Sequence, residues 1–372
     1  MRNHKRHFSG PCACCRNAGP AIPANVDRRT VLTGMSAIGL AVSAPMVARV
    51  APALAEAAAT TPHLIDVHHH IVPPFYLGEN RERLARGGKI NPAWLEWEPQ
   101  KTLDAMNKHG VATAVLSLST PGVWLGDAAA ARSTARRCND YAATLARDHP
   151  GRFGLFSALA LPDTDGSLQE IEYAFDTLKA DGIGLLSSYG DKWLGDIAYQ
   201  PVFEELNRRK AVVFVHPTIP NCCRTLMPHI SPIAAEVPQD TTRTVMSLLF
   251  SGAFTRFKDI RFIFCRAGGS VPIDAARMAE YGPKDLIDKL PNGVDYELKR
   301  LYYDIAVSGH RPAIAALTSF VPMSQILFGS DFPYRALSET ADSLPQLGLS
   351  AAALQAIGRD NALTLLPHLA RS

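Results

Sequence analysis

The sequence has no large excess of charge of either sign: its 372 residues include 38 Lys and Arg against 35 Asp and Glu, a net charge of +3. It also lacks a run of basic residues interleaved with aromatics, and it has no internal repeat. These absences argue against a nucleic-acid or anionic-membrane partner. At 47% hydrophobic and 20% charged residues, the composition is typical of a soluble globular enzyme that acts on a small molecule.

Few of the cysteines are suited to form disulfide bonds in the mature protein. Three of the seven lie in an N-terminal segment that we expect to be removed: Cys12, Cys14 and Cys15. Cys222 and Cys223 are adjacent, which strains a bridge between them. Cys138 and Cys265 have the surroundings of small buried apolar residues. We therefore predict no disulfide framework.

The N-terminus has the pattern of an export signal. The pair Arg28-Arg29 precedes a weakly apolar segment that runs to Ala48, and Ala53 and Ala55 offer an A-x-A cleavage site. This pattern predicts a twin-arginine signal peptide over residues 1–55, a periplasmic or otherwise exported protein, and no stable membrane association after cleavage. A retained anchor is the alternative, but Gly and Pro residues interrupt the apolar run.

Residues 62–372 alternate short apolar runs with longer helical patterns. Eight runs bounded by turn residues predict strands: Leu64–His70, Ala112–Ser117, Phe153–Leu159, Ile183–Ser187, Ala211–His216, Arg261–Cys265, Leu301–Ile305 and Ile326–Gly329. Helical spacing falls between them, at Thr102–Lys108, Ala128–Arg147, Ser167–Ala180, Pro201–Arg209 and Asp240–Ser251, the last with Asp240 as its cap. Eight such units predict a (β/α)8 barrel. An open doubly wound sheet is the alternative, but no G-x-G-x-x-G follows the first strand.

Potential metal ligands lie at the ends of three predicted strands. Asp66, His68 and His70 alternate along the first strand, so their side chains are expected on one face, with His69 on the other. His216 and Asp331 follow the fifth and eighth strands at the end where barrel active sites are built. Any one of them alone is more simply a hydrogen-bonded structural residue. Together His68, His70, His216 and Asp331 predict one divalent metal, with Zn²⁺ the leading candidate.

These residues carry a resemblance to a known family. Asp66-Val67-His68-His69-His70, Val213-Phe214-Val215-His216-Pro217 and Leu327-Phe328-Gly329-Ser330-Asp331-Phe332-Pro333-Tyr334 resemble the amidohydrolase-related proteins typified by 2-amino-3-carboxymuconate-6-semialdehyde decarboxylase. The resemblance spans Leu64 to Pro367. Three further segments are most similar to the 6-methylsalicylate decarboxylase branch: Trp193-Leu194-Gly195-Asp196, Asn207-Arg208-Arg209-Lys210 and Asp240-Thr241-Thr242-Arg243.

One position departs from the family. Such proteins usually have S-H-A-G-G after the sixth strand, where the His acts as acid or base, whereas this chain has Cys265-Arg266-Ala267-Gly268-Gly269. Arginine has no acceptor and stays protonated, so it cannot take a proton from water. Arg266 shares a strand face with Phe262 and Phe264 and is expected in the site, its charge offset by a substrate carboxylate or by an acid such as Asp304. The alternative is that it points to solvent and the protein is inactive.

The resemblance implies a non-oxidative decarboxylase of a hydroxylated aromatic acid such as 6-methylsalicylate. In that reaction Asp331 would donate the proton to the ring carbon and Arg266 would bind the substrate carboxylate. Two alternatives stay open: hydrolysis of a lactone, ester or amide, which would need the missing base, and a non-catalytic relative.

The resemblance also implies a homodimer. Arg277 lies eleven residues after Arg266, the spacing at which the carboxymuconate-type enzymes have an arginine that reaches the neighbouring subunit's site. A structural surface arginine is the alternative. Two long connections, Ile71–Lys101 and Pro217–Gln239, are expected to cover the barrel mouth, with Trp94, Trp97 and the stretch around Cys222 and Cys223 forming part of the cover or simply packing against neighbouring loops.

Overall fold

The computed structural model describes residues 63–85, 95–190, 192–224, 226–227 and 229–371. The expected signal peptide, its three cysteines and Trp94 lie outside these ranges. In the described part of the chain, eight parallel strands form one sheet in the order β1-β2-β3-β4-β7-β8-β9-β10. Their bounds are Leu64–Ile71, Val111–Leu118, Phe153–Ala158, Gly182–Leu186, Val212–His216, Arg261–Phe264, Tyr302–Asp304 and Ile326–Leu327. Every predicted strand is present, with ends that differ by one or two residues.

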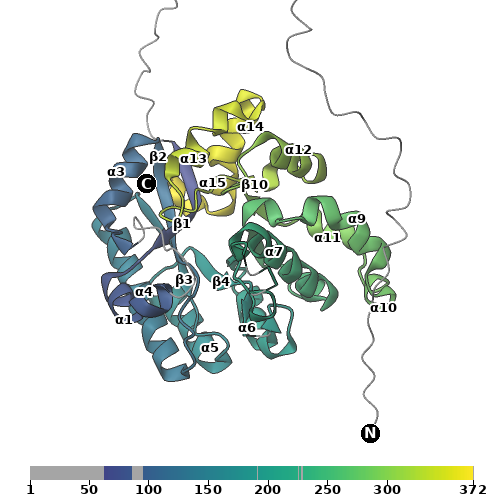
Figure 1. Cartoon of the computed structure of the whole chain (residues 1–372), viewed down its shortest axis with the longest axis horizontal. Coiled ribbons are helices and arrows are strands. Elements are labelled where there is room, and N and C mark those ends of the chain that lie inside the picture. The colour runs from purple at the N-terminus through teal and green to yellow at the C-terminus, as the bar shows by residue number, and fades with distance from the viewer. Residues whose placement is uncertain (1–62, 86–94, 191, 225, 228, 372) are drawn as a thin grey trace, which may run out of the picture. The chain divides into compact units, whose positions relative to one another are not determined.

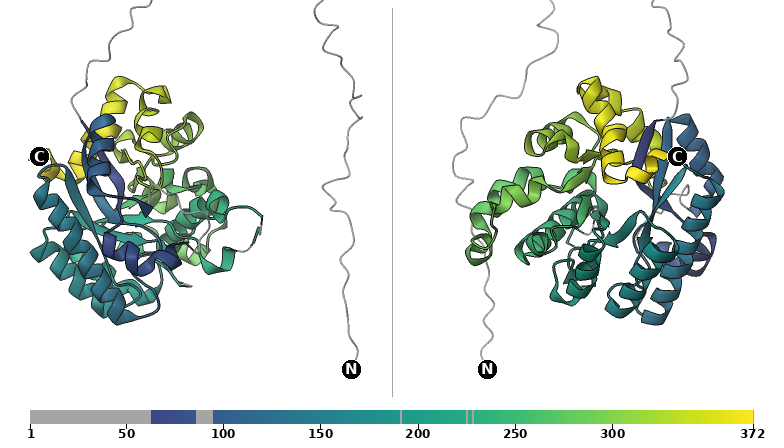
Figure 2. Two further views of the ribbon diagram at one scale, coloured as in Figure 1. Left: turned by 60° about the vertical axis from the view of Figure 1, so that its left-hand side comes forward. Right: turned by 180° about the vertical axis from the view of Figure 1, so that it is seen from behind.

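The sheet closes on itself between β1 and β10. Val67 N donates to Phe328 O at 3.1 Å, and Asp331 N donates to His68 O at 2.8 Å. Helices surround the strands as an outer layer (Figures 1 and 2). Closed parallel strands inside a ring of helices are the (β/α)8 barrel predicted from the sequence.

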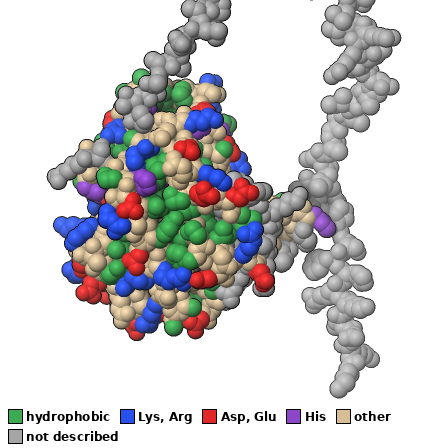
Figure 3. Space-filling view, turned by 90° about the vertical axis from the view of Figure 1, so that its left-hand side faces the viewer, with side chains coloured by type: hydrophobic (Ala, Val, Ile, Leu, Met, Phe, Trp, Pro, Cys, Tyr) green, Lys and Arg blue, Asp and Glu red, His purple; other side chains and the backbone are tan. Residues whose placement is uncertain are grey.

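The main helices of the outer layer follow the strands in turn. They are α1 (Pro74–Ala85), α3 (Pro99–Lys108), α4 (Ala128–Asp148), α5 (Thr164–Glu172), α6 (Gln200–Arg208), α7 (Pro232–Phe250), α9 (Val271–Tyr281), α11 (Gly293–Lys299) and α12 (Arg311–Phe320). Shorter helices complete the layer: α8 (Ala253–Arg256), α10 (Lys284–Ile287), α13 (Leu337–Ala341), α14 (Ala351–Gln355) and α15 (Asn361–Leu365). On the face that Figure 3 shows, acidic and basic side chains are interspersed around hydrophobic ones.

Helix α7 corrects one prediction. It begins at Pro232, so Asp240 lies inside the helix and does not cap it. Pro at the first helical position favours this earlier start, because its missing N–H would have no partner there in any case. Asp240 is fully buried, and its carboxylate accepts hydrogen bonds from outside the helix.

A two-stranded antiparallel hairpin between β4 and α6 was not predicted. Its strands are β5 (Ser188–Tyr189) and β6 (Lys192–Trp193). Two-residue strands are too short to show a hydrophobic period, so sequence periodicity gives no signal for them.

Candidate metal centre

Two of the candidate ligands, His68 and His70, lie on β1, and both are fully buried. His68 Nδ1 donates to Asp304 Oδ2 at 2.9 Å. Ser117 Oγ donates to His69 O, so His70 Nδ1 donates to that hydroxyl at 3.0 Å. Because each ring gives an Nδ1 proton to a partner, the neutral form of each ring presents an Nε2 lone pair to the barrel centre.

The other two candidates complete a compact cluster around the carboxylate of Asp331. Asp331 Oδ1 lies 3.2 Å from Nε2 of His68, 3.2 Å from Nε2 of His70 and 3.9 Å from Nε2 of His216. One ligand atom from each of the four residues lies within 4.8 Å of all the others. The structure therefore brings together the four residues that the sequence predicted as metal ligands.

Several polar atoms in this cluster lack a hydrogen-bond partner among the described residues: His68 Nε2, His70 Nε2 and Asp331 Oδ1. Buried polar atoms without partners are costly, and here they face one another. A divalent ion bound among them would satisfy all three at once. Three imidazoles and one carboxylate are a suitable donor set for such an ion.

Burial lowers the pKa of two of these imidazoles and so favours their neutral form. Desolvation lowers the pKa of His70 to about 4 and that of His216 to about 3, with partial compensation by Asp331. Neutral imidazole is the form that binds metal. Burial acts on His68 in the same direction, but Cys265 and Asp304 beside the ring outweigh it and raise the pKa of His68 well above its usual value.

Arg266 lies in the site and not in solvent. Its Nη2 donates to Asp331 Oδ2 at 2.6 Å, and its side chain is 14% exposed. The sequence suggested Asp304 as the acid that offsets the charge of Arg266, and the structure corrects this: the acid is Asp331. Asp304 already accepts three hydrogen bonds, one from His68 Nδ1 through Oδ2 and two from the backbone N–H groups of Arg266 and Ala306 through Oδ1.

The ion pair also fixes the charge of Asp331. Burial acts to raise the pKa of this carboxyl, but the Arg266 guanidinium and the nearby imidazoles hold it well below its usual range. Both residues have left-handed backbone, with φ of 57° at Arg266 and 66° at Asp331. Non-glycine residues in that region carry backbone strain and are frequent at functional sites.

The predicted faces of β1 need one correction. Asp66 does not join the cluster with His68 and His70. Its Oδ1 accepts from His68 N and Ser330 N, and its Oδ2 accepts from His69 Nδ1 and Ser330 Oγ. The pairing of β1 with β2 shifts register between Asp66 and His69, and such an irregularity breaks strict alternation. Asp66 instead ties β1 to the segment that follows β10.

Two supporting residues, Ser117 and Gly329, were not identified from the sequence. Ser117 lies near the end of β2, where its hydroxyl orients His70. Its place at the end of a predicted strand was the signal that could have identified it. A Cβ on Gly329 would lie 2.8 Å from Cβ of His68. Glycine there lets the chain before Asp331 pass close to His68.

The loops after β1 and β7 lie at this end of the barrel. Tyr76 on α1 donates to Gly122 O in the connection after β2, and Ser188 Oγ and Thr218 Oγ1 lie 3.0 Å apart beyond the ends of β4 and β7. Trp97 packs against neighbouring segments: it is buried, its indole N–H donates to Thr102 Oγ1 and its ring contacts the Tyr141 ring. Cys222 and Cys223 are free thiols.

Arg277 lies on α9, exposed, with its guanidinium 5.9 Å from the centre of the Tyr281 ring. No described contact links it to the metal ligands of its own chain.

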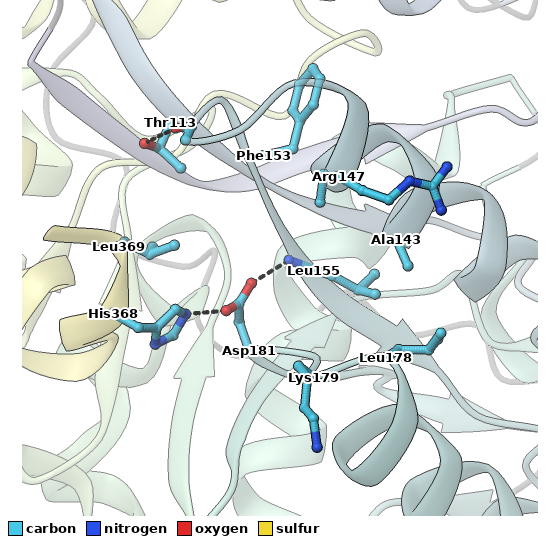
Figure 4. A pocket seen from close by; sticks show the side chains of 12 residues that line it. Thr113, Ala143, Arg147, Phe153, Leu155, Leu178, Lys179, Asp181, His368 and Leu369 are labelled. Carbon is cyan, nitrogen blue, oxygen red and sulfur yellow. Dashed lines mark hydrogen bonds and ion pairs between the residues drawn. The ribbon is translucent and has the colours of Figure 1, made fainter. Parts of the chain in front are cut away.

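A cavity of about 360 Å³ lies apart from the metal cluster. Thr113, Phe153 and Asp181 line it where β2, β3 and β4 begin (Figure 4). Among the described residues, no helix is long and apolar enough to cross a membrane.

Comparison with known proteins agrees with this geometry. Residues 65–367 match the amidohydrolase family model. The chain is 36% identical to 6-methylsalicylic acid decarboxylase acuB of Aspergillus aculeatus over 83% of this chain and 97% of that protein. It is 33% identical to the 6-methylsalicylic acid decarboxylase of Penicillium expansum over 82% and 96% of the two chains.

Solved structures share the fold. A dihydroxybenzoic acid decarboxylase from Polaromonas, crystallised with manganese and 2-nitroresorcinol, matches with a TM-score of 0.74 at 21% identity, covering 82% of this chain and 97% of that chain. The family expected from the sequence motifs is confirmed: this chain belongs to the amidohydrolase family.

Proposed function

We propose that the protein is a metal-dependent decarboxylase of a hydroxylated aromatic acid such as 6-methylsalicylate. The observation that carries this proposal is the buried cluster of His68, His70, His216 and Asp331 with the Arg266 guanidinium against it. Relatives that share a third of the sequence over nearly their full length are 6-methylsalicylic acid decarboxylases.

The four ligands would hold the ion, and we propose Zn²⁺. When bound, the ion would act as a Lewis acid toward the phenolate and carboxylate oxygens of a salicylate. Three imidazoles favour zinc, whereas manganese is the metal in the Polaromonas decarboxylase structure. Metal analysis of the purified protein distinguishes them.

Arg266 is placed to bind the substrate carboxylate. Its Nη2 holds Asp331, while its buried Nε has no hydrogen-bond partner among the described residues. A planar guanidinium suits a carboxylate. Arg266 would thereby orient the group that leaves as carbon dioxide.

The ring carbon that loses carbon dioxide keeps the electron pair of the broken bond and needs a proton. Asp331 is ionised before substrate binds, so it must first take up the proton that it delivers, and the substrate phenol can supply it. In this scheme the phenol proton passes to Asp331 and from there to the ring carbon. The phenolate that remains takes a proton from water after release.

The same geometry disfavours hydrolysis. A hydrolase of this type needs a base to generate hydroxide, and Arg266 stands where the family has a histidine. The test is carbon dioxide release from a panel that includes 6-methylsalicylate and 2,6-dihydroxybenzoate, run in parallel with ester and lactone hydrolysis. Decarboxylation without hydrolysis is the expected result. Hydrolysis alone, or a metal-loaded protein inactive in both assays, would overturn the proposal.

We also propose that residues 1–55 are a twin-arginine signal peptide that directs export. The pair Arg28-Arg29 and the small residues at Ala53 and Ala55 support it. Fused to a reporter that is active only after export, this segment should direct export, and replacing both arginines by lysine should stop it.

Finally, we propose a homodimer in which Arg277 contributes to the neighbouring site. Ile273 and Tyr281, one turn before and one turn after Arg277 on α9, are each 73% exposed. Large apolar side chains exposed together are typical of association surfaces, and a second copy of the chain is the partner that we propose.

A further inference from the structure

The three imidazoles of the cluster are not held in the same way. His68 and His70 each give their Nδ1 proton to a fixed partner, Asp304 and Ser117. His216 Nδ1 has no hydrogen-bond partner among the described residues, and the Ser119 hydroxyl is 3.5 Å from its Nε2. The position of the His216 ring therefore depends on how its backbone is held.

Hydrogen bonds hold that backbone at His216 itself and two residues after it. Ser187 N donates to His216 O at 2.8 Å. Two residues later, Thr218 N donates to Asp240 Oδ2 at 3.0 Å and to Ser187 Oγ at 2.9 Å. The Ser187 hydroxyl in turn donates to Asp240 Oδ2, so one buried carboxylate links both ties.

Asp240 belongs to a polar stripe on α7. Asp240, Thr244 and Ser247 are spaced by four and three residues, which puts them on one face of the helix. Thr244 Oγ1 donates to Ser187 O at 2.9 Å, and Ser247 Oγ accepts from Gly195 N at 3.1 Å. A Cβ on Gly195 would lie 2.1 Å from Ser247 O, so glycine allows this close approach.

Of these three stripe residues, only Asp240 accepts hydrogen bonds from Thr218, whereas Thr244 reaches Ser187 O and Ser247 reaches Gly195 N. The other oxygen of Asp240, Oδ1, accepts from Trp193 Nε1 at 2.8 Å. Both carboxylate oxygens thus face donors. An amide in place of the carboxylate would put an NH2 group against the indole N–H or against the donors around Thr218.

We propose that Asp240 is a positioning residue that sets the place of the metal ligand His216 through the backbone of Ser187 and Thr218. This inference rests on the metal centre under Proposed function. Residues that orient metal ligands from outside the coordination shell usually contribute about 10-fold to 100-fold to metal affinity.

The test is the dissociation constant for Zn²⁺ and for Mn²⁺, measured on the metal-free protein by competition with a chromophoric chelator. Asp240→Asn should weaken binding by about 10-fold to 100-fold. Ser247→Ala is the matched control, because it removes a hydrogen bond from the same stripe without touching the His216 segment. It should lower the urea midpoint while leaving the dissociation constant within about threefold.

Asp240→Asn with wild-type metal affinity, or Ser247→Ala with equally weakened affinity, would overturn the inference. If Asp240→Asn does not fold, Ser187→Ala takes its place: it removes the hydroxyl that joins Asp240 to Thr218 N and should weaken metal binding by about 10-fold. Ser187→Ala with unchanged affinity would contradict the proposal equally. Failure of the wild-type chain to bind either metal would overturn the metal centre itself, an outcome distinct from these.

Discussion

Arg266 and Asp331 form a largely buried ion pair, with Nη2 of the arginine 2.6 Å from Oδ2 of the aspartate. The other oxygen of Asp331 faces His68 and His70. One carboxylate therefore stands between the proposed metal and a fixed positive charge. The guanidinium occupies the place of a family histidine without the ability to accept a proton.

Replacing Arg266 by His distinguishes the two kinds of chemistry. If Asp331 supplies the proton and Arg266 only orients substrate, the decarboxylation rate of Arg266→His should change by less than about 10²-fold. If catalysis requires a base at this position, the substitution restores one and the rate should rise by more. Steady-state carbon dioxide release distinguishes these two outcomes. A second variant, Arg266→Lys, keeps the positive charge but loses the planar guanidinium, and it should mainly raise KM.

Removing two imidazoles should abolish metal retention. In His68→Ala/His70→Ala the cluster keeps only His216 and Asp331, too few ligands for a stable site. Metal content per chain after gel filtration is the measurement. His368→Ala is the control, because His368 pairs with Asp181 where β4 begins, at the other end of the barrel. Unchanged metal in the double variant would contradict the assignment of the site.

The metal-free protein should lose stability between pH 6.5 and about 4. Over this range the unfolded chain protonates His70 and His216, whose ordinary pKa is 6.5, while the folded chain, with pKa values of about 4 and 3, does not. Each group contributes up to about 1.4 kcal/mol per pH unit.

His68 does not change this slope, because a group with a raised folded pKa keeps its full stabilisation below the unfolded value. Its contribution declines only as pH rises above 6.5. Urea midpoints at pH 6.5, 5.5 and 4.5 measure the effect, and a flatter pH dependence is expected in His70→Asn/His216→Asn. Equal slopes in the two proteins would show that other groups cause it.

Arg277 should serve the neighbouring subunit. Arg277→Ala should lower kcat/KM by about 10-fold to 100-fold, the usual loss for a hydrogen bond to a charged group. Mixing the Arg277→Ala protein with the inactive His70→Ala protein should restore activity. In the mixed dimer, the Arg277→Ala subunit has intact metal ligands and its neighbour supplies Arg277. Arg147→Ala, at the far end of the barrel, is the control. Full activity from a monomer would rule out the shared site.

The sequence by itself determined the barrel and the four candidate ligands. Buried parallel strands such as Val212–His216 are short apolar runs, and their carboxyl ends must meet on one face of a barrel, so His216 and Asp331 could be placed together while far apart in the chain. These inferences need only local pattern and one topological rule.

Tertiary structure alone decided which groups pair inside the site. The Asp66 side chain does not share a strand face with His68 and His70, because the ladder between β1 and β2 shifts register. The two-residue period of a strand does not predict such a shift. Arg266 paired with Asp331 because His68 and two backbone N–H groups already occupy Asp304. Asp240 became a buried acceptor and not a helix cap because its donors come from β6 and from the segments after β4 and β7. Each outcome depends on competition among donors and acceptors that only the folded chain brings within reach.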